Sequence, residues 1–226
     1  MHISARTQML DRYSVLDSLE VIKHLGFDGV EIGFLRKDWS VIPLSEMPVA
    51  AIRERAEALG LGPNVVSFHS DYVYDDAVLE RILEVIPAVH GFGTDILIVN
   101  GAKKQAGDAA EWQAMVDRTR TLVDAAEAHD VVLALEFEPG FVVGSTADLL
   151  RLFAEIPSPH LAANLDLGHV FLCDPDPMAA IADLGKKIAH CHIEDMPAGV
   201  HDHRLPWEGD MDLGAYIRAL RDAGFD

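Results

Sequence analysis

Hydrophobic and polar positions follow two alternating patterns along the whole chain. Short continuous apolar runs, typical of buried parallel strands, are predicted at 1–4, 29–33, 62–69, 95–99, 131–136, 161–166 and 187–192. Segments with apolar residues every three or four positions, typical of amphipathic helices, lie at 14–25, 45–59, 75–90, 109–129, 146–155, 177–184 and 212–223. Pro87 is expected to bend or interrupt the third of these helices. The pattern therefore predicts seven successive strand–helix units.

Repeated strand–helix units predict a parallel sheet in an α/β protein. For a chain of 226 residues, the common form of such a sheet is a closed (β/α)8 TIM barrel, with one domain over residues 1–226. Only seven units are present, so we expect this chain to lack the eighth strand and helix and to be truncated at its C-terminus. The alternative is an open, doubly wound sheet, but no glycine-rich phosphate-binding turn follows the first predicted strand.

The composition narrows the classes of partner. The chain has 37 acidic and 18 basic residues, a formal net charge of −19, which argues against binding nucleic acid or an anionic membrane. Because a local metal site could still attract a phosphate group, a nuclease remains an alternative. The two cysteines, Cys173 and Cys191, give no disulfide framework, and we find no signal peptide and no apolar run of membrane-spanning length. We therefore expect a soluble cytoplasmic protein.

Four of the predicted strands end at a side chain that can bind a metal ion, namely His69, Glu136, Asp166 and His192. Because parallel barrel strands bring their C-terminal ends to one mouth, we expect the last three to converge. Two carboxylates and an imidazole suit Mn²⁺, Mg²⁺, Co²⁺ or Zn²⁺. Glu136 is also the candidate catalytic residue, as a proton carrier. The alternative for each residue is a salt-bridged or hydrogen-bonded position at the barrel rim.

Further polar residues are expected around this mouth. His169 follows Asp166 by three positions, around a turn at Gly168, and could bind substrate or a second metal ion. The long loop after the seventh strand is rich in histidine, and such loops on the active face of a barrel are often functional. We predict His201 as an additional metal ligand; the predicted substrate-binding residues are His69, His169, His203 and Arg204. A solvated loop is the alternative for the last segment.

Other residues near the mouth receive weaker or structural assignments. His190 shares a face with His192 but lies one layer deeper, where a hydrogen-bonded core histidine is expected. Cys191 should point to the surrounding helices and serve packing. Glu31 is a weaker candidate for substrate binding, and Asp212 is expected to cap the last helix.

Three motifs together resemble the xylose-isomerase-like barrel superfamily, and most of all its sugar phosphate isomerase/epimerase group. They are LEFEPG at 135–140, LDLGH at 165–169, and HCHIEDM at 190–196 followed by HDHRLPWEGD at 201–210. The resemblance covers nearly the whole chain and implies one divalent ion held by Glu, Asp, His and a final Glu. The first three fall on Glu136, Asp166 and His192, and the final Glu belongs to the eighth strand, which is absent here. Because the epimerases move the substrate proton with the first and last Glu, this chain shows one half of that pair.

The resemblance implies a metal-dependent isomerase or epimerase that acts by enolisation of a small keto- or aldo-sugar, with or without a phosphate. The alternatives are an apurinic endonuclease of the endonuclease IV type, which uses three zinc ions and more histidines, and a metal-dependent sugar lyase or dehydratase. A non-enzymatic alternative is a degenerate barrel acting as a partner subunit. The expected partner is a small carbohydrate rather than nucleic acid or a membrane, and a homodimer is left open.

Overall fold

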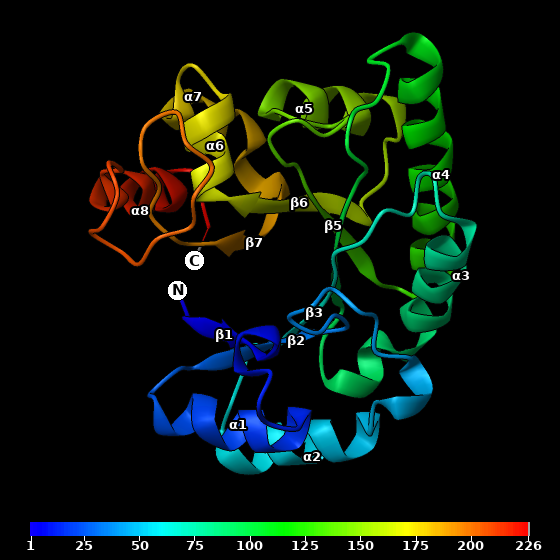
Figure 1. Cartoon of the computed structure of the whole chain (residues 1–226), viewed down its shortest axis with the longest axis vertical. Helices are drawn as coiled ribbons and strands as arrows, with labels where there is room; N and C mark the ends of the chain where they lie inside the picture. The colour runs from blue at the N-terminus through cyan, green and yellow to red at the C-terminus, as the bar shows by residue number, and fades with distance from the viewer. Residues whose placement is uncertain (226) are drawn as a thin grey trace.

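The computed structural model describes residues 1–225 and contains one curled, parallel sheet. Its strands follow each other in chain order, and each pairs in parallel with the next. They are β1 Ser4–Arg6, β2 Gly29–Gly33, β3 Val65–Phe68, β4 Ile96–Asn100, β5 Val132–Glu136, β6 Leu161–Asp166 and β7 Ile188–His192. Among the described residues, no strand joins β7 to β1, and the two face each other across an opening (Figure 1). The predicted barrel without its eighth strand is confirmed.

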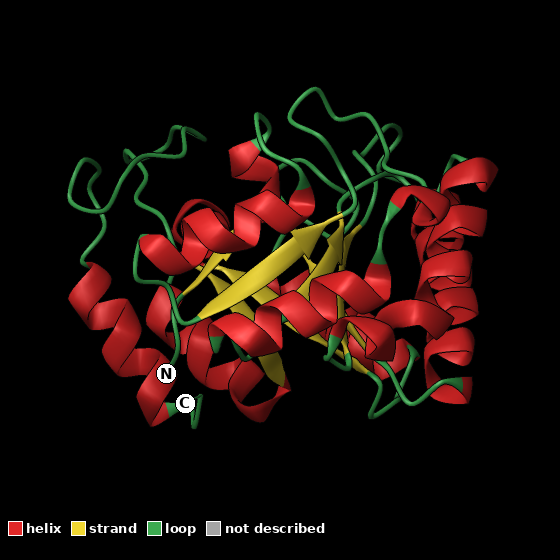
Figure 2. Cartoon of the chain, turned by 90° about the horizontal axis from the view of Figure 1, so that it is seen from below, coloured by secondary structure: helices red, strands yellow, loops and turns green. Residues whose placement is uncertain are grey.

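Eight α-helices cover the outside of the sheet in the described part of the chain (Figure 2). They are α1 Val15–His24, α2 Val49–Leu59, α3 Asp76–Val85, α4 Ala109–Ala128, α5 Thr146–Glu155, α6 Leu167–Cys173, α7 Pro177–Leu184 and α8 Leu213–Asp222. Side-chain caps begin most of them: Ser14 accepts a hydrogen bond from the Asp17 N–H, and Asp212 caps α8 as expected. None of the helices within 1–225 is both long enough and apolar enough to cross a membrane.

The structure differs from the predicted elements at several element ends and at Gly168. The first strand lies at Ser4–Arg6 rather than 1–4, and β3 is shorter than 62–69. The third helix ends at Val85 and continues as a 3₁₀ helix, Ile86–Phe92, so the interruption expected at Pro87 is confirmed. The turn expected at Gly168 is instead the first turn of α6. That helix starts directly after Asp166, because the Asp166 carboxylate accepts the free His169 N–H.

Strand alternation makes the inside of the barrel apolar at one end and polar at the other. Val65, Ile98 and Ala134 form a small interior cluster, separate from the main core between sheet and helices. Residues two positions apart on a strand share a face. Ala134 is therefore followed on the inner face by Glu136, and inward positions near the C-terminal strand ends carry charged groups. This change from apolar to polar places the candidate site at the mouth.

Candidate active site

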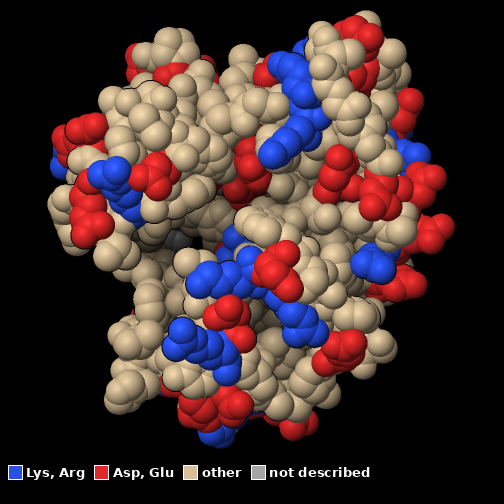
Figure 3. Space-filling view, viewed as in Figure 1, with Lys and Arg blue, Asp and Glu red and all other residues tan. Residues whose placement is uncertain are grey.

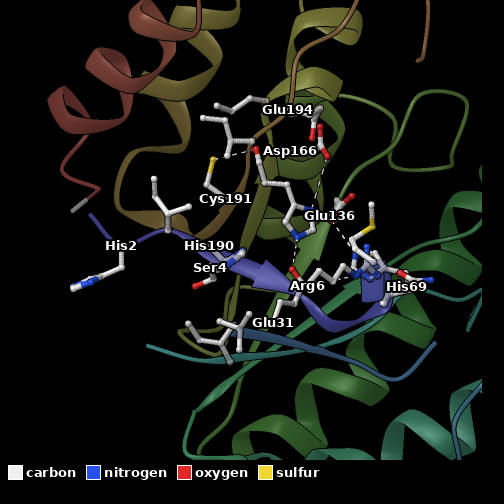
Figure 4. Close-up of a pocket in the computed structure, with 18 of the residues that line it drawn as sticks. His2, Ser4, Arg6, Glu31, His69, Glu136, Asp166, His190, Cys191 and Glu194 are labelled. Atoms are coloured by element: carbon white, nitrogen blue, oxygen red, sulfur yellow. Dashed lines mark hydrogen bonds and ion pairs between the residues drawn. The ribbon is translucent and has the colours of Figure 1, made fainter. Parts of the chain in front are cut away.

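Five ionisable side chains from five strands or their ends meet at the mouth of the barrel, and Figure 4 labels four of them. Four of them are almost fully buried, at 3–6% exposure, and the fifth, His192, has a side chain exposed by 17%. The five residues are Glu31, His69, Glu136, Asp166 and His192. Burial of this many charges is unfavourable unless each charge meets an opposite charge or hydrogen-bond donors.

The three predicted metal ligands lie together. His192 Nδ1 is 3.0 Å from Glu136 Oε2 and 3.9 Å from Asp166 Oδ2. Glu136 and Asp166 each bring an oxygen within 4.8 Å of the other and of a ring nitrogen of His169. Residues that are up to 56 positions apart in the sequence therefore form one compact donor set of two carboxylates and an imidazole.

Glu136 is the most densely contacted of these residues. Its Oε2 accepts a hydrogen bond from Asn164 Nδ2 at 2.5 Å and lies 3.0 Å from His69 Nε2, in addition to His192. Burial acts to raise the pKa of Glu136, but the charges of His192 and His69 outweigh it and hold that pKa well below its usual value. Glu136 is therefore ionised at neutral pH.

Asp166 and His192 shift in the opposite direction from Glu136. Burial and the nearby carboxylates of Glu194 and Glu136 raise the pKa of Asp166 well above its usual value. Burial acts to lower the pKa of His192, but Glu136 and Glu31 raise it well above its usual value. The carboxylates at the mouth therefore repel one another, and the positive groups of the protein do not fully neutralise them. A divalent cation fits this donor set, because it would relieve the repulsion and bind O and N ligands.

A second cluster is formed by three histidines beside the first. His169 Nε2 lies 3.2 Å from His201 Nε2, and His201 Nε2 lies 3.2 Å from His203 Nε2. His169 is buried and its Nδ1 donates to the Phe137 carbonyl at 2.8 Å, so its Nε2 presents a lone pair to the cluster. Burial lowers the pKa of His169, which keeps the ring neutral. His203 Nδ1 is 3.8 Å from Glu194 Oε2.

The remaining residues considered from the sequence, His69, Arg204 and His190, differ in how far they are free to contact a ligand. Both ring nitrogens of His69 are engaged, Nδ1 with Arg6 Nη2 at 2.6 Å and Nε2 with Glu136, so a substrate contact would require the loss of one of these hydrogen bonds. Arg204 lines the cavity, is about half exposed, and pairs with Asp202 at 2.9 Å. His190 is the hydrogen-bonded core histidine that was expected. Its Nδ1 lies 2.8 Å from Asn164 Oδ1, and burial lowers its pKa to about 4.

Sequence reasoning missed three residues of this site. Arg6 ends β1 and Asn164 lies two positions before Asp166, so the alternation that selected the other residues would have found both. Their side chains were overlooked because neither arginine nor asparagine is a common metal ligand. Glu194 lies two positions after His192 and accepts the Gly168 N–H at 2.8 Å, which ties the loop after β7 to the start of α6.

The clustered side chains line a cavity of about 1310 Å³. It extends from the mouth to the opening between β1 and β7, where Ser4 and Ala189 contribute to its wall. Figure 3 shows this face of the molecule hollowed between the part that carries β1 and the part that carries β7. The volume exceeds the range of about 300–1,000 Å³ typical of small-molecule sites. A sugar-sized ligand therefore has ample room.

Comparison with known proteins agrees with this architecture. Fructoselysine 3-epimerase of Escherichia coli O157:H7 is 29% identical over 119 residues, which make up 51% of this chain and 43% of that enzyme. The chain thus spans less than half the length of this curated relative in the match. D-psicose 3-epimerase of Enterocloster bolteae is 26% identical over 113 residues, or 49% of this chain and 36% of that enzyme.

Solved structures share the fold over the whole chain, and a family model matches most of its sequence. The crystal structure of the IOLI protein with a bound zinc atom superposes with a TM-score of 0.83 at 20% identity, covering 100% of this chain and 86% of that one. At that identity the likeness shows the fold alone. The model for the xylose isomerase-like TIM barrel matches residues 19–226, and the protein described here therefore belongs to the xylose isomerase-like TIM barrel family.

Proposed function

We propose that this protein is a metal-dependent sugar or sugar phosphate isomerase or epimerase. The observation that supports this most directly is the convergence of Glu136, Asp166 and His192 at the barrel mouth, with His192 Nδ1 at 3.0 and 3.9 Å from the two carboxylates. The names of the sequence relatives point to the same class, since both are sugar 3-epimerases. Because these matches cover less than half of each relative, the activity and the substrate are part of the proposal.

Glu136, Asp166 and His192 would hold the divalent ion, which is Mn²⁺, Mg²⁺, Co²⁺ or Zn²⁺. When bound, such an ion supplies Lewis acidity toward the carbonyl and hydroxyl oxygens of an open-chain sugar. The protein's own contribution is to fix the orientation of the ligand side chains before the ion and the substrate bind. The Asn164 amide and the His69 ring bind Glu136 Oε2, so the carboxylate does not need to reorganise when substrate arrives.

Glu136 is the proposed catalytic residue, acting as a base toward the carbon next to the carbonyl. Its lowered pKa keeps the carboxylate free of a proton at neutral pH, which is the state a base requires. Glu136 would take the proton and return it to the neighbouring carbon in an isomerisation. An epimerisation needs a second group to deliver a proton to the same carbon from the opposite face. Glu31, Glu138, Asp166 and Glu194 are among the other carboxylates that line the cavity.

Binding of the rest of the sugar is assigned to the rim. His169 and His203 expose ring nitrogens toward the cavity, and Arg204 lies on the same loop as His203. The lone pair of His169 Nε2 can accept from a sugar hydroxyl, an N–H of His203 can donate to one, and the Arg204 guanidinium can fix an anionic or carbonyl group. His69 would contribute directly only if it left Arg6 or Glu136, so we assign it mainly to the support of Glu136.

The three-histidine cluster supports an additional ion, as proposed for His201. The two Nε2–Nε2 distances of 3.2 Å are close to the separation of about 3.3 Å between ligands that are 2.0–2.1 Å from a tetrahedral ion. This is the observation that favours an endonuclease IV-type enzyme as a second candidate. The formal charge of −19 opposes it, because DNA binding needs basic residues to neutralise phosphates. Metal analysis separates the two: about three zinc ions per chain favours the nuclease, and one labile ion favours the isomerase.

The test of the main proposal is solvent proton exchange. The purified protein is loaded with Mn²⁺, incubated in deuterated water with a panel of ketoses and their phosphates, and the sugars are analysed by proton NMR. We expect deuterium at a carbon next to the carbonyl, or a new isomer, with at least one substrate. Glu136→Gln, which keeps the size of the side chain but removes the base, should abolish exchange.

Two results would count against this function. Absence of exchange across the panel, in protein shown by metal analysis to hold its ion, would argue against enolisation. Exchange that continues at the wild-type rate in Glu136→Gln would remove Glu136 from its proposed role. A metal-dependent lyase or dehydratase would show exchange together with loss of water or chain cleavage, which the same NMR spectra reveal.

A further inference from the structure

We propose that Glu31, held by Arg6, is a positioning residue that turns the His192 ring so that Nδ1 faces Glu136 and Asp166. The inference rests on the proposed function, because it concerns the same metal ligand. It gives a role to Arg6, which sequence reasoning did not assign to the site, and a different role to Glu31, which was only a weaker candidate for substrate binding. Glu31 and Arg6 come from the first two strands, on the far side of the opening from His192.

The two nitrogens of His192 meet different surroundings. Nε2 lies 2.8 Å from Glu31 Oε2. Nδ1 lies 3.0 Å from Glu136 Oε2, among the candidate metal ligands. A divalent ion bound there would take the place of the Nδ1 proton, and the Glu31 carboxylate would keep the other proton on Nε2, so that Nδ1 serves the ion. Histidine ligands of metal ions are commonly oriented in this way by a carboxylate.

Glu31 is itself fixed rather than free to move. It is 3% exposed, and its second oxygen, Oε1, lies 2.9 Å from Arg6 Nε. Arg6 extends its Nη2 to His69 Nδ1 at 2.6 Å, and the other nitrogen of His69 contacts Glu136. The contacts therefore form a closed ring, from Glu136 through His69, Arg6 and Glu31 to His192 and back to Glu136. Figure 4 labels the four members other than His192.

This ring also spans the opening of the barrel. His192 and Glu31 are 161 positions apart, and no backbone pairing joins β7 to β1 in the described residues. The side-chain contact is thus a direct tie between the two sides of the opening at the level of the site. Without Glu31, the His192 ring would lose the partner that selects its rotation about the Cβ–Cγ bond, and β7 would lose this tie.

The experiment compares metal binding by the wild type, Glu31→Gln, Glu31→Ala and Arg6→Leu. Co²⁺ and Zn²⁺ are titrated into metal-free protein, with affinity from calorimetry and coordination geometry from the visible spectrum of the Co²⁺ form. Glu111→Gln is the matched control: Glu111 is also a buried carboxylate, but it binds Tyr74 and two backbone N–H groups and does not line the cavity. Far-UV circular dichroism checks that each variant folds.

We expect Glu31→Ala to weaken metal binding by about 10–100-fold, as is usual for loss of a residue that orients a ligand. Glu31→Gln should recover part of this loss, since its amide oxygen can still accept from Nε2–H. Arg6→Leu should show an intermediate loss, and Glu111→Gln none. In the Zn²⁺-loaded wild type, ¹⁵N NMR should find the His192 proton on Nε2.

The outcomes separate this inference from the function on which it rests. A wild type that binds no divalent ion overturns both proposals. If the wild type binds an ion but Glu31→Ala matches it in affinity and Co²⁺ spectrum, only the positioning role fails. Complete loss of binding in Glu31→Ala with no recovery in Glu31→Gln, in folded protein, also overturns it, because Glu31 would then be a metal ligand itself.

Discussion

At the scale of single residues, the mouth of the barrel holds carboxylates in opposite electrostatic states. Glu136 receives three nitrogen donors and has a lowered pKa, whereas Asp166 faces Glu194 and Glu136 and has a raised one. The difference follows from neighbours rather than from burial, since both side chains are almost completely buried. Asp166 is therefore the residue whose charge is least favourable in the metal-free protein.

Replacement of Asp166 by Asn should stabilise the metal-free protein. The amide removes the repelling charge and keeps an oxygen that can accept the His169 N–H. We expect a gain of about 1 kcal/mol, or a melting temperature roughly 2–4 °C higher, measured by thermal unfolding at pH 7 with chelator present.

The gain should depend on pH. Because the pKa of Asp166 is raised in the folded state, the destabilisation that its charge causes grows as pH rises above about 4, so the gain should shrink at pH 4. Stabilisation by metal should be lost in this variant. A lower melting temperature without metal at pH 7 would contradict the repulsion argument.

Metal affinity should depend on pH through His192. Its raised pKa means that both ring nitrogens carry a proton at neutral pH in the metal-free protein. The proton on Nδ1 must leave before a metal ion can bind. Affinity should therefore rise about tenfold per pH unit below that pKa. Calorimetry in two buffers of different ionisation enthalpy should find about one proton released per ion. An affinity that stays constant between about pH 6 and 8 would show that the ring is already neutral.

At the scale of elements, the loop after β7 depends on its contact with the start of α6. Gly168 lies in the first turn of α6, and its N–H donates to Glu194. A Cβ at this position would overlap the Glu194 carboxylate and the end of Met196. The absence of a side chain at Gly168 thus lets the loop that carries His201 and His203 approach the helix.

Gly168→Ala should disturb this approach and weaken the three-histidine cluster. Overpacking of this kind costs about 1–3 kcal/mol, visible as a lower midpoint of urea unfolding and as loss of any metal bound by His201. Gly214→Ala is the control, since its Cβ would meet no backbone atom and would approach only the end of the Arg218 side chain and the Asp212 carboxylate, at 3.2 and 3.3 Å. That variant should be neutral or slightly stabilising, by about 0.5–1 kcal/mol. Equal stability of the two variants would show that the loop moves freely away from Gly168.

At the scale of the whole molecule, the sheet is strongly paired in its middle and open at its ends. β5 and β6 are buried along nearly their whole length, whereas β1 and most of β7 are only partly buried. The ends of the sheet are joined at the site by the side chains of His192 and Glu31. The proposed metal ligands Glu136, Asp166 and His192 lie on the neighbouring strands β5, β6 and β7, so an ion bound by them would hold this end of the sheet together.

Chelation should therefore lower the melting temperature of metal-loaded protein. An ion at 100 times its dissociation constant stabilises the folded state by about 2.7 kcal/mol, which for a chain of this size corresponds to roughly 5–10 °C. Differential scanning fluorimetry with and without EDTA measures this shift. Glu136→Gln, with one ligand charge removed but an amide oxygen kept, should show a smaller shift. A wild type that is indifferent to chelation would indicate that no ion contributes to stability.

How much of the site could be predicted depends on the range of the contacts. Glu136, Asp166 and His192 were found because each ends a strand, and parallel strands present these ends on one side. Arg6 and Asn164 obey the same alternation, but nothing in their own segments indicates that Arg6 reaches Glu31 or that Asn164 binds Glu136. The α6 helix was missed because its cap is the same Asp166 that was assigned to metal binding.

The order of strands and helices, and the position of acidic and histidine side chains at the strand ends, were determined by the sequence alone, since both depend on periodicities within ten or twenty neighbouring residues. The pairing of Glu31 with His192 and the meeting of His169 with His201 were decided only by the tertiary structure. Curling of the sheet brings the first and last strands to opposite sides of one opening. Which side chains then touch across it is set by strand register and side-chain rotation, which no local pattern encodes.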